Sequence, residues 1–173
     1  MKTKITLRTL CQVAMLIALT FVLERFVPPI NLPSIRLSFA FIPMMLCGML
    51  FGPLWGAAAY GIADILGWPI MGLTPLPLIL LSRILSGFIF GLVLHRDKPK
   101  FWPHAVVSTL TEQIICSAGL TTLALAGMTG MPYWAKLIER LPQFGIVIVL
   151  QLAVFPALVR ISAALKKSGF VTV

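Results

Sequence analysis

This chain of 173 residues is 59% hydrophobic and only 11% charged, whereas soluble domains average about 25% charged residues. Such a composition excludes an ordinary water-soluble fold, and the length accommodates roughly six membrane-spanning helices of about 20 residues. Those helices leave no space for a large soluble catalytic domain. The net charge of +9 gathers in the predicted loops and at both ends, which is typical of membrane topology and argues against nucleic-acid binding.

Apolar segments follow one another along the chain, separated by polar or proline-containing stretches. The segment at 7–27 is predicted to be a retained helix, because no small-residue cleavage site of a signal peptide follows it. Gly52-Pro53 divides the next apolar stretch, since proline lacks an amide donor and disfavours a helical residue before it. The stretches at 28–36, 69–75 and 127–140 are predicted loops. The predicted helices are 7–27, 37–51, 54–68, 76–95, 103–126 and 141–165.

The distribution of Lys and Arg predicts the orientation of these helices. An even number of spans places both termini on one side of the membrane. The basic residues on that side are Lys2, Lys4, Arg8, Arg96, Lys98, Lys100, Arg160, Lys166 and Lys167, and those on the other side are Arg25, Arg36, Lys136 and Arg140. Because cytoplasmic loops are enriched in Lys and Arg, we predict that both termini are cytoplasmic. Residues 1–173 are predicted to form one all-α domain of six transmembrane helices, as a multi-pass protein of the plasma membrane.

Four ionisable residues in or beside the apolar segments are candidate functional residues, because a charge in hydrocarbon costs several kcal/mol unless it is paired or lines a cavity. The rise of about 1.5 Å per residue places Arg25, Asp64 and Arg83 in one layer near the outer side. Glu112 falls in the inner half of its helix, where a structural role is predicted.

Two interpretations of Asp64 and Arg83 remain open from the sequence. They neutralise one another, as buried opposite charges usually do, or they face a cavity and bind a polar solute. In the second case Arg83 offers a bidentate clamp for a carboxylate, and Asp64 accepts hydrogen bonds from N–H groups. The other candidate substrate-binding residues on the outer side are Arg25, Arg36, Trp68, Thr121 and Gln143.

Small residues form a stripe on the first helix, where Cys11, Ala14 and Ala18 recur at a spacing of three and four residues. Such a stripe allows another helix to approach closely in lipid, either within this chain or from a partner. The pairs Gly87/Gly91 and Ala57/Gly61 are predicted to be internal contacts.

Motifs of hydrolytic enzymes, of metal sites and of phosphate-binding loops are absent from the sequence. We therefore predict no catalytic residue, no metal and no cofactor. ATP-driven transport would require a partner that hydrolyses ATP. A small intramembrane enzyme and a structural partner without a ligand are the alternatives from other classes.

Several motifs resemble those of a transporter family. IRLSFAFIP (35–43), CGMLFGPLWG (47–56) and GIADILG (61–67) resemble the substrate-binding S-components of energy-coupling factor (ECF) vitamin transporters, with the folate-type branch the nearest. AMLIA (14–18) looks like the A-x-x-x-A motif of that family's first helix, and LERF (23–26) looks like the arginine-containing end of the same helix. LSRILSGFIFG (81–91) is similar to the fourth-helix motif L-S-x-x-L-S-G-x-x-x-G.

The resemblance implies a high-affinity vitamin-binding subunit that captures its ligand from outside, with outer loops as a lid. It implies docking on a transmembrane coupling subunit that binds two ATPase subunits, with Ala14 and Ala18 on the docking face. Folate is the first candidate ligand. Pantothenate or another water-soluble vitamin is the alternative, because Arg83, Thr121 and Ala124 depart from the pattern of folate-type relatives.

Overall fold

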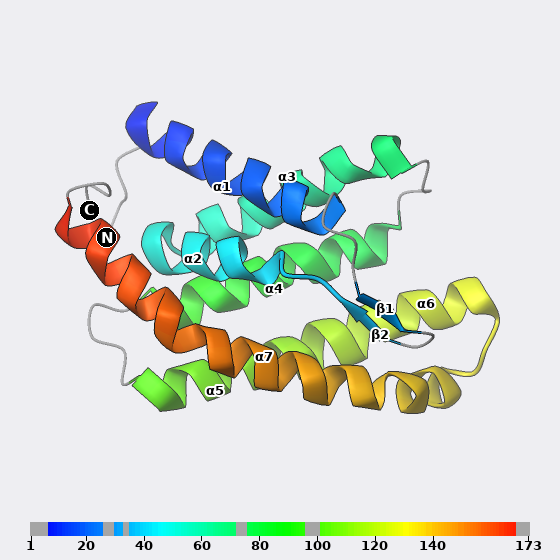
Figure 1. Ribbon diagram of the computed structural model, residues 1–173. Helices are drawn as coiled ribbons and strands as arrows, with labels where there is room; N and C mark the ends of the chain where they lie inside the picture. The colour runs from blue at the N-terminus through cyan, green and yellow to red at the C-terminus, as the bar shows by residue number, and fades with distance from the viewer. Residues whose placement is uncertain (1–6, 26–29, 33–34, 72–75, 96–100, 169–173) are drawn as a thin grey trace.

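The computed structural model describes residues 7–25, 30–32, 35–71, 76–95 and 101–168. Within these residues the chain is helical apart from one short hairpin. The elements are α1 (Leu7–Arg25), β1 (Ile30–Leu32), β2 (Ile35–Leu37), α2 (Phe41–Phe51), α3 (Pro53–Met71), α4 (Pro77–Leu94), α5 (Phe101–Thr111), the π-helix η1 (Glu112–Thr121), α6 (Thr122–Thr129) and α7 (Tyr133–Lys167). Because α5, η1 and α6 follow without a break, the described residues form six helical rods. The start of α1 and the end of α7 lie at the same end of the bundle (Figure 1).

Three helices of the described residues, α1, α4 and α7, are long and apolar enough to cross a membrane, and α2 is a shorter apolar helix. The predicted break at Gly52-Pro53 is confirmed. Gly52 ends α2 with a φ of 93° and donates its N–H to the Gly48 carbonyl. A left-handed φ favours glycine, which has no Cβ to clash.

The short helix α2 is the centre of the bundle because it is apolar on every side. On one side its Met44 and Cys47 pack with residues of α1 and α3, among them Val13 and Tyr60. On the other side Met45 packs with residues of α4, α5 and α7, as part of a cluster that contains Phe90, Ala105 and Phe155. The helix therefore joins two apolar cores that together hold every rod in place.

Glycines bring α3 and α4 into backbone contact, as expected for Gly87 and Gly91. A Cβ added to Gly87 would lie 2.3 Å from the Gly56 carbonyl oxygen, and one added to Gly91 would lie 2.3 Å from Pro53 Cα. Close backbone approach of this kind favours helix association in lipid, where the burial of apolar surface provides little driving force for association. The predicted internal role of this pair is confirmed.

Three loop predictions are wrong in part. The predicted loop 127–140 lies mostly in helices, because α6 runs to Thr129 and α7 begins at Tyr133 and continues through Pro142. Its charges suit a helix, since Lys136 and Glu139 form an ion pair one turn apart. The predicted loop 28–36 contains the hairpin, in which Asn31 pairs with Arg36. The helix α3 also extends to Met71, past the predicted start of the next loop.

We expect Gly87→Ala to destabilise the protein by about 1–3 kcal/mol, because the new methyl group meets rigid backbone. Gly145→Ala is the matched control on α7, where an added Cβ meets nothing within 4 Å. That control should be neutral or gain up to about 1 kcal/mol from helix propensity. Denaturant unfolding in detergent micelles measures both free energies of unfolding. Equal stability of the two variants would show that α3 and α4 do not depend on this contact.

Candidate ligand-binding site

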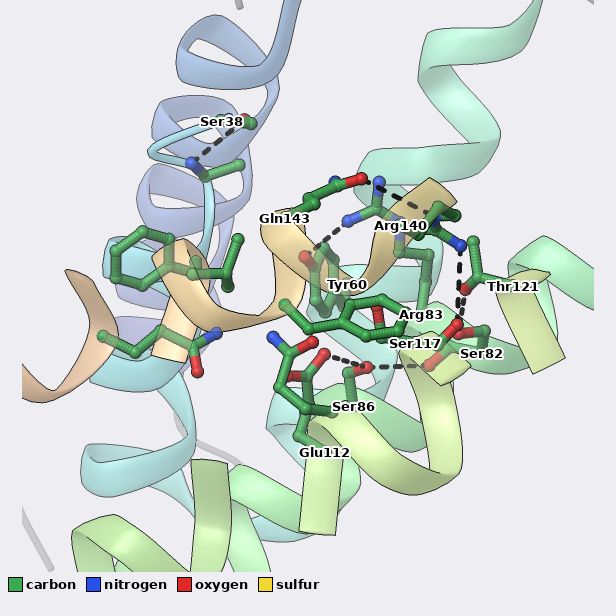
Figure 2. Close-up of a pocket in the computed structure, with 16 residues that line it drawn as sticks. Ser38, Tyr60, Ser82, Arg83, Ser86, Glu112, Ser117, Thr121, Arg140 and Gln143 are labelled. Carbon is green, nitrogen blue, oxygen red and sulfur yellow. Dashed lines mark hydrogen bonds between the residues drawn. The ribbon is translucent and has the colours of Figure 1, made fainter. Parts of the chain in front are cut away.

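A polar cavity of about 150 Å³ lies among α3, α4, η1, α7 and the segment that leads into α2. Ligand pockets usually measure about 300–1,000 Å³, so a vitamin-sized ligand requires this cavity to widen. The residues that line it are Ser38, Ala40, Phe41, Tyr60, Ser82, Arg83, Ser86, Glu112, Gln113, Ser117, Thr121, Arg140, Gln143, Phe144, Val147 and Gln151. Figure 2 shows Arg140 and Gln143 at one end, Glu112 and Ser86 at the other, and Tyr60 and Arg83 between them.

Arg83 is held by partners from two other helices. Its Nη1 donates to the Tyr60 hydroxyl at 2.6 Å, and its Nη2 donates to Glu24 Oε1 at 3.0 Å. The guanidinium also lies over the Tyr60 ring, 5.2 Å from the centroid. A cation in the apolar part of a bundle requires such compensation. Arg83 therefore already has a carboxylate partner, which reduces its capacity to clamp a ligand carboxylate.

Arg140 makes no such ion pair with the residues that the structure describes. It is only 8% exposed, and its Nη1 donates to the Thr122 hydroxyl at 3.0 Å and to the Ser117 carbonyl at 3.5 Å. Its Nε donates to Gln143 Oε1 at 3.5 Å. These acceptors are neutral, and no carboxylate of the described residues lies within ion-pair distance of Arg140. The cavity thus contains a buried cation whose hydrogen-bond partners are all neutral, while Glu139 of the same helix interacts with it electrostatically.

The opposite end of the cavity is rich in hydrogen-bond acceptors. Ser86 donates to Glu112 Oε1 at 3.3 Å. Glu112 Oε2 and the side-chain oxygens of Gln113 and Gln151 are buried without a hydrogen-bond partner among the described residues. The amide of Gln151 is nevertheless a hydrogen-bond partner of the Glu112 carboxylate. Unsatisfied buried acceptors are uncommon in folded proteins, so this end of the cavity is suited to a donor.

The π-helix η1 explains how residues of one segment face the cavity over its whole length. Thr121 and Thr122 donate their hydroxyls to the carbonyls of Cys116 and Ser117, each five residues earlier. The wider turn of a π-helix aligns residues five apart, and such segments are frequent at functional sites. Glu112 and Ser117, five residues apart, therefore both line the cavity. Thr121 also makes a hydrogen bond of 2.8 Å with Ser82 of α4.

Three of the predicted binding residues, Arg83, Thr121 and Gln143, line the cavity. Asp64 is buried in α3, one turn beyond Tyr60, and is not among the lining residues. The carboxylate that pairs with Arg83 is Glu24, which the sequence analysis did not single out. The backbones of Arg25, Arg36 and Trp68 lie in α1, β2 and α3, but their side chains are outside the described part of the structure.

Sequence reasoning did not assign Glu112 or Arg140 to the cavity. Glu112 was predicted to have a structural role in the inner half of its helix, and its side chain lines the end of the cavity away from Arg140, where it accepts a hydrogen bond from Ser86, one turn along α4 from Arg83. Arg140 was assigned to the end of the predicted loop 127–140. The i, i+3 spacing of Arg140 and Gln143 is the signal that would have placed both on one helical face.

The small residues of α1 lie on the outside of the bundle. Cys11, Ala14 and Ala18 are exposed, whereas Val13 and Leu16 of the same helix are buried in the core. Within the described residues the stripe is thus unused for internal packing.

Comparison with known proteins identifies the family. The model of the ECF transporter, substrate-specific component family matches residues 8–159. The chain belongs to this family. It is therefore a membrane-embedded transporter component and not an enzyme.

Members with known names resemble the chain along most of its length. The folate transporter FolT of Streptococcus mutans is 27% identical over 96% of this chain and 95% of that protein. The folate transporter FolT of Leuconostoc mesenteroides is 30% identical over 72% of this chain and 67% of that protein. A crystal structure of FolT bound with folic acid is 28% identical, with a TM-score of 0.77, and the match covers 88% of this chain and 93% of that one.

We expect Glu24→Gln to lower the free energy of unfolding by about 1–3 kcal/mol. Loss of one partner of a buried ion pair costs more, but the Arg83 side chain is 34% exposed, so solvent screens part of the effect. Lys136→Gln, which breaks the Lys136–Glu139 pair, is the control and should cost less than about 1 kcal/mol. The same unfolding assay measures both. Similar values for the two variants would contradict a structural role of the Glu24–Arg83 pair.

Proposed function

We propose that this chain is the folate-binding subunit of an ECF importer. It captures folate outside the cell and delivers it through a transmembrane coupling subunit powered by two ATPase subunits. The observation that carries the proposal is the similarity, over nearly the full length of both chains, to a FolT structure that holds folic acid. Two further relatives named as folate transporters support it.

The cavity chemistry agrees with this ligand. Folate carries carboxylates on its glutamate end, and Arg140 is a buried cation that makes no ion pair among the described residues. A charge-assisted bond to a carboxylate would balance that cation. Thr121 and Gln143 supply polar groups to the same wall. Four other residues remain predicted substrate-binding residues: Asp64, which does not line the cavity, and Arg25, Arg36 and Trp68, whose side chains are outside the described part of the structure.

The length of the cavity favours an elongated ligand. Arg140 and Gln151 both line it, and they are eleven residues apart on α7, roughly 16 Å at the rise of an α-helix. Folate has ionic groups at one end and a polar ring at the other. Pantothenate is shorter and has no ring, so it engages one end of such a cavity only.

In the membrane, the chain would cross six times with both termini in the cytoplasm. The six helical rods support this number, and the shared position of the start of α1 and the end of α7 supports an even count (Figure 1). The excess of Lys and Arg on the side of the termini supports the orientation. The exposed face of α1 around Ala14 and Ala18 is then available to the coupling subunit.

We expect folate, and not pantothenate, to stabilise the purified protein by RT ln(1 + [L]/Kd), which is about 2.7 kcal/mol at a hundredfold excess over Kd. Arg140→Gln should weaken folate binding about tenfold to a hundredfold, the value of a hydrogen bond to a charged group. Arg160→Gln, at an exposed position of the same helix, should bind as the wild type does. Titration calorimetry in detergent measures these affinities. Binding of pantothenate without binding of folate would overturn the proposed ligand.

We expect Ala14→Arg or Ala18→Arg to abolish folate uptake while folate binding stays unchanged, because a long charged side chain separates two closely packed helices. Ala157→Arg is the control, since Ala157 is exposed on α7, away from the stripe. Uptake is measured in proteoliposomes that contain the coupling and ATPase subunits. Normal uptake by both α1 variants would show that the stripe is not the docking face.

A further inference from the structure

The π-helix η1 is unusually long. Helices of this kind are rare, and most form a single turn inside an α-helix, whereas η1 extends over ten residues, from Glu112 to Thr121. The rarity of the π form indicates that backbone hydrogen bonds alone favour the α form. A segment that keeps the wider turn over this length therefore requires stabilising contacts from outside its own backbone.

The carbonyls of three consecutive η1 residues each accept a hydrogen bond from a side chain of another helix. The three bonds are Ser82 to Cys116 at 2.9 Å, Arg140 to Ser117 at 3.5 Å and Tyr133 to Ala118 at 3.0 Å. The donors come from α4 on one side and from α7 on the other. Ser82 and Arg140 line the cavity, whereas Tyr133 does not. Of the three donors, Tyr133 therefore acts on η1 from outside the space that receives a ligand.

The register of η1 decides which of its side chains face the cavity. Glu112 begins η1 and Ser117 follows five residues later, and both line the cavity. In an α-helix, residues five apart lie roughly 140° apart around the axis. An α-helical η1 that kept Glu112 in place would turn Ser117 away from the cavity wall. The binding wall formed by this segment thus depends on the π register.

We propose that Tyr133 is a positioning residue for ligand binding, which keeps η1 in the π register through its hydrogen bond to the Ala118 carbonyl. This inference rests on the proposed folate function and adds a residue outside the cavity that sets the affinity. The Trp134 ring packs edge-on against the Tyr133 ring, with 5.5 Å between the centroids, and so orients the phenol. Loss of the bond lowers the fraction of molecules in the binding register, and the apparent Kd rises as that fraction falls.

Tyr133→Phe removes the hydroxyl group and keeps the ring. Its affinity for folate, measured by calorimetric titration, should fall about threefold to tenfold, the equivalent of one neutral hydrogen bond. Thr129→Val is the matched control. The Thr129 hydroxyl also donates to a helix carbonyl, that of Leu125 at 2.9 Å, but this bond lies within α6 and outside the cavity. The control should bind folate as the wild type does.

Amide hydrogen exchange, followed by mass spectrometry, reports on η1 itself. In ligand-free Tyr133→Phe, the amides of residues 113–122 should exchange about threefold to tenfold faster than in the wild type, because local opening costs less free energy. The amides of α4 should keep their wild-type rates. Saturating folate should restore the protection of η1, since a ligand favours the conformation that it binds. A merely structural role would instead raise exchange throughout the bundle and leave the affinity of the folded protein unchanged.

The outcomes distinguish the two proposals. Wild-type protein that binds no folate overturns the proposed function, while exchange in the ligand-free proteins still decides whether Tyr133 holds the register of η1. Wild-type protein that binds folate, with unchanged affinity in Tyr133→Phe, overturns the positioning role alone. Equal exchange of η1 in the two proteins also overturns it. Weaker folate binding together with faster exchange confined to η1 supports it.

Discussion

The high cost of an uncompensated charge in a low-dielectric environment constrains this structure more than any other single factor. Arg83 on α4 is compensated by Glu24 of α1 and by the Tyr60 hydroxyl of α3. These contacts connect α1, α3 and α4 at one point next to the cavity. Since that ion pair satisfies Arg83, the second cavity cation, Arg140, is the one whose hydrogen-bond partners are all neutral.

Apolar packing supplies the rigidity that such polar contacts require. Most residues of the helix α2 are buried, and the glycine contacts bring the backbones of α3 and α4 close together. Side chains on α3 and α4, among them Tyr60 and Ser86, are therefore fixed relative to one another. The polar cavity lies beside this rigid pair, against η1 and α7, while large apolar side chains such as Leu54 and Val149 remain exposed toward the surroundings.

The sequence indicated part of the site and missed the rest for physical reasons. Residue type and depth were sufficient to select Arg83, Thr121 and Gln143, because polar groups in an apolar helix rarely face lipid. They were insufficient for Arg140, whose helix contains a proline that usually marks a boundary. They did not assign Glu112 to the cavity either, because the π-helical turn that aligns it with Ser117 has no signature in hydropathy.

The sequence by itself determined the helical membrane class, the break at Gly52-Pro53 and the expected family. These features depend on hydropathy, on the placement of proline and glycine and on short motifs, all of which are local properties of the chain. Pairing among charges is not local. Glu24 and Arg83 are 59 residues apart in sequence, and which carboxylate meets which arginine depends on the rotation and crossing of three helices. Only the tertiary structure decided that Arg83 is neutralised and that Arg140 and Glu112 occupy opposite ends of one cavity, because side-chain partners in a bundle are set by interhelical packing.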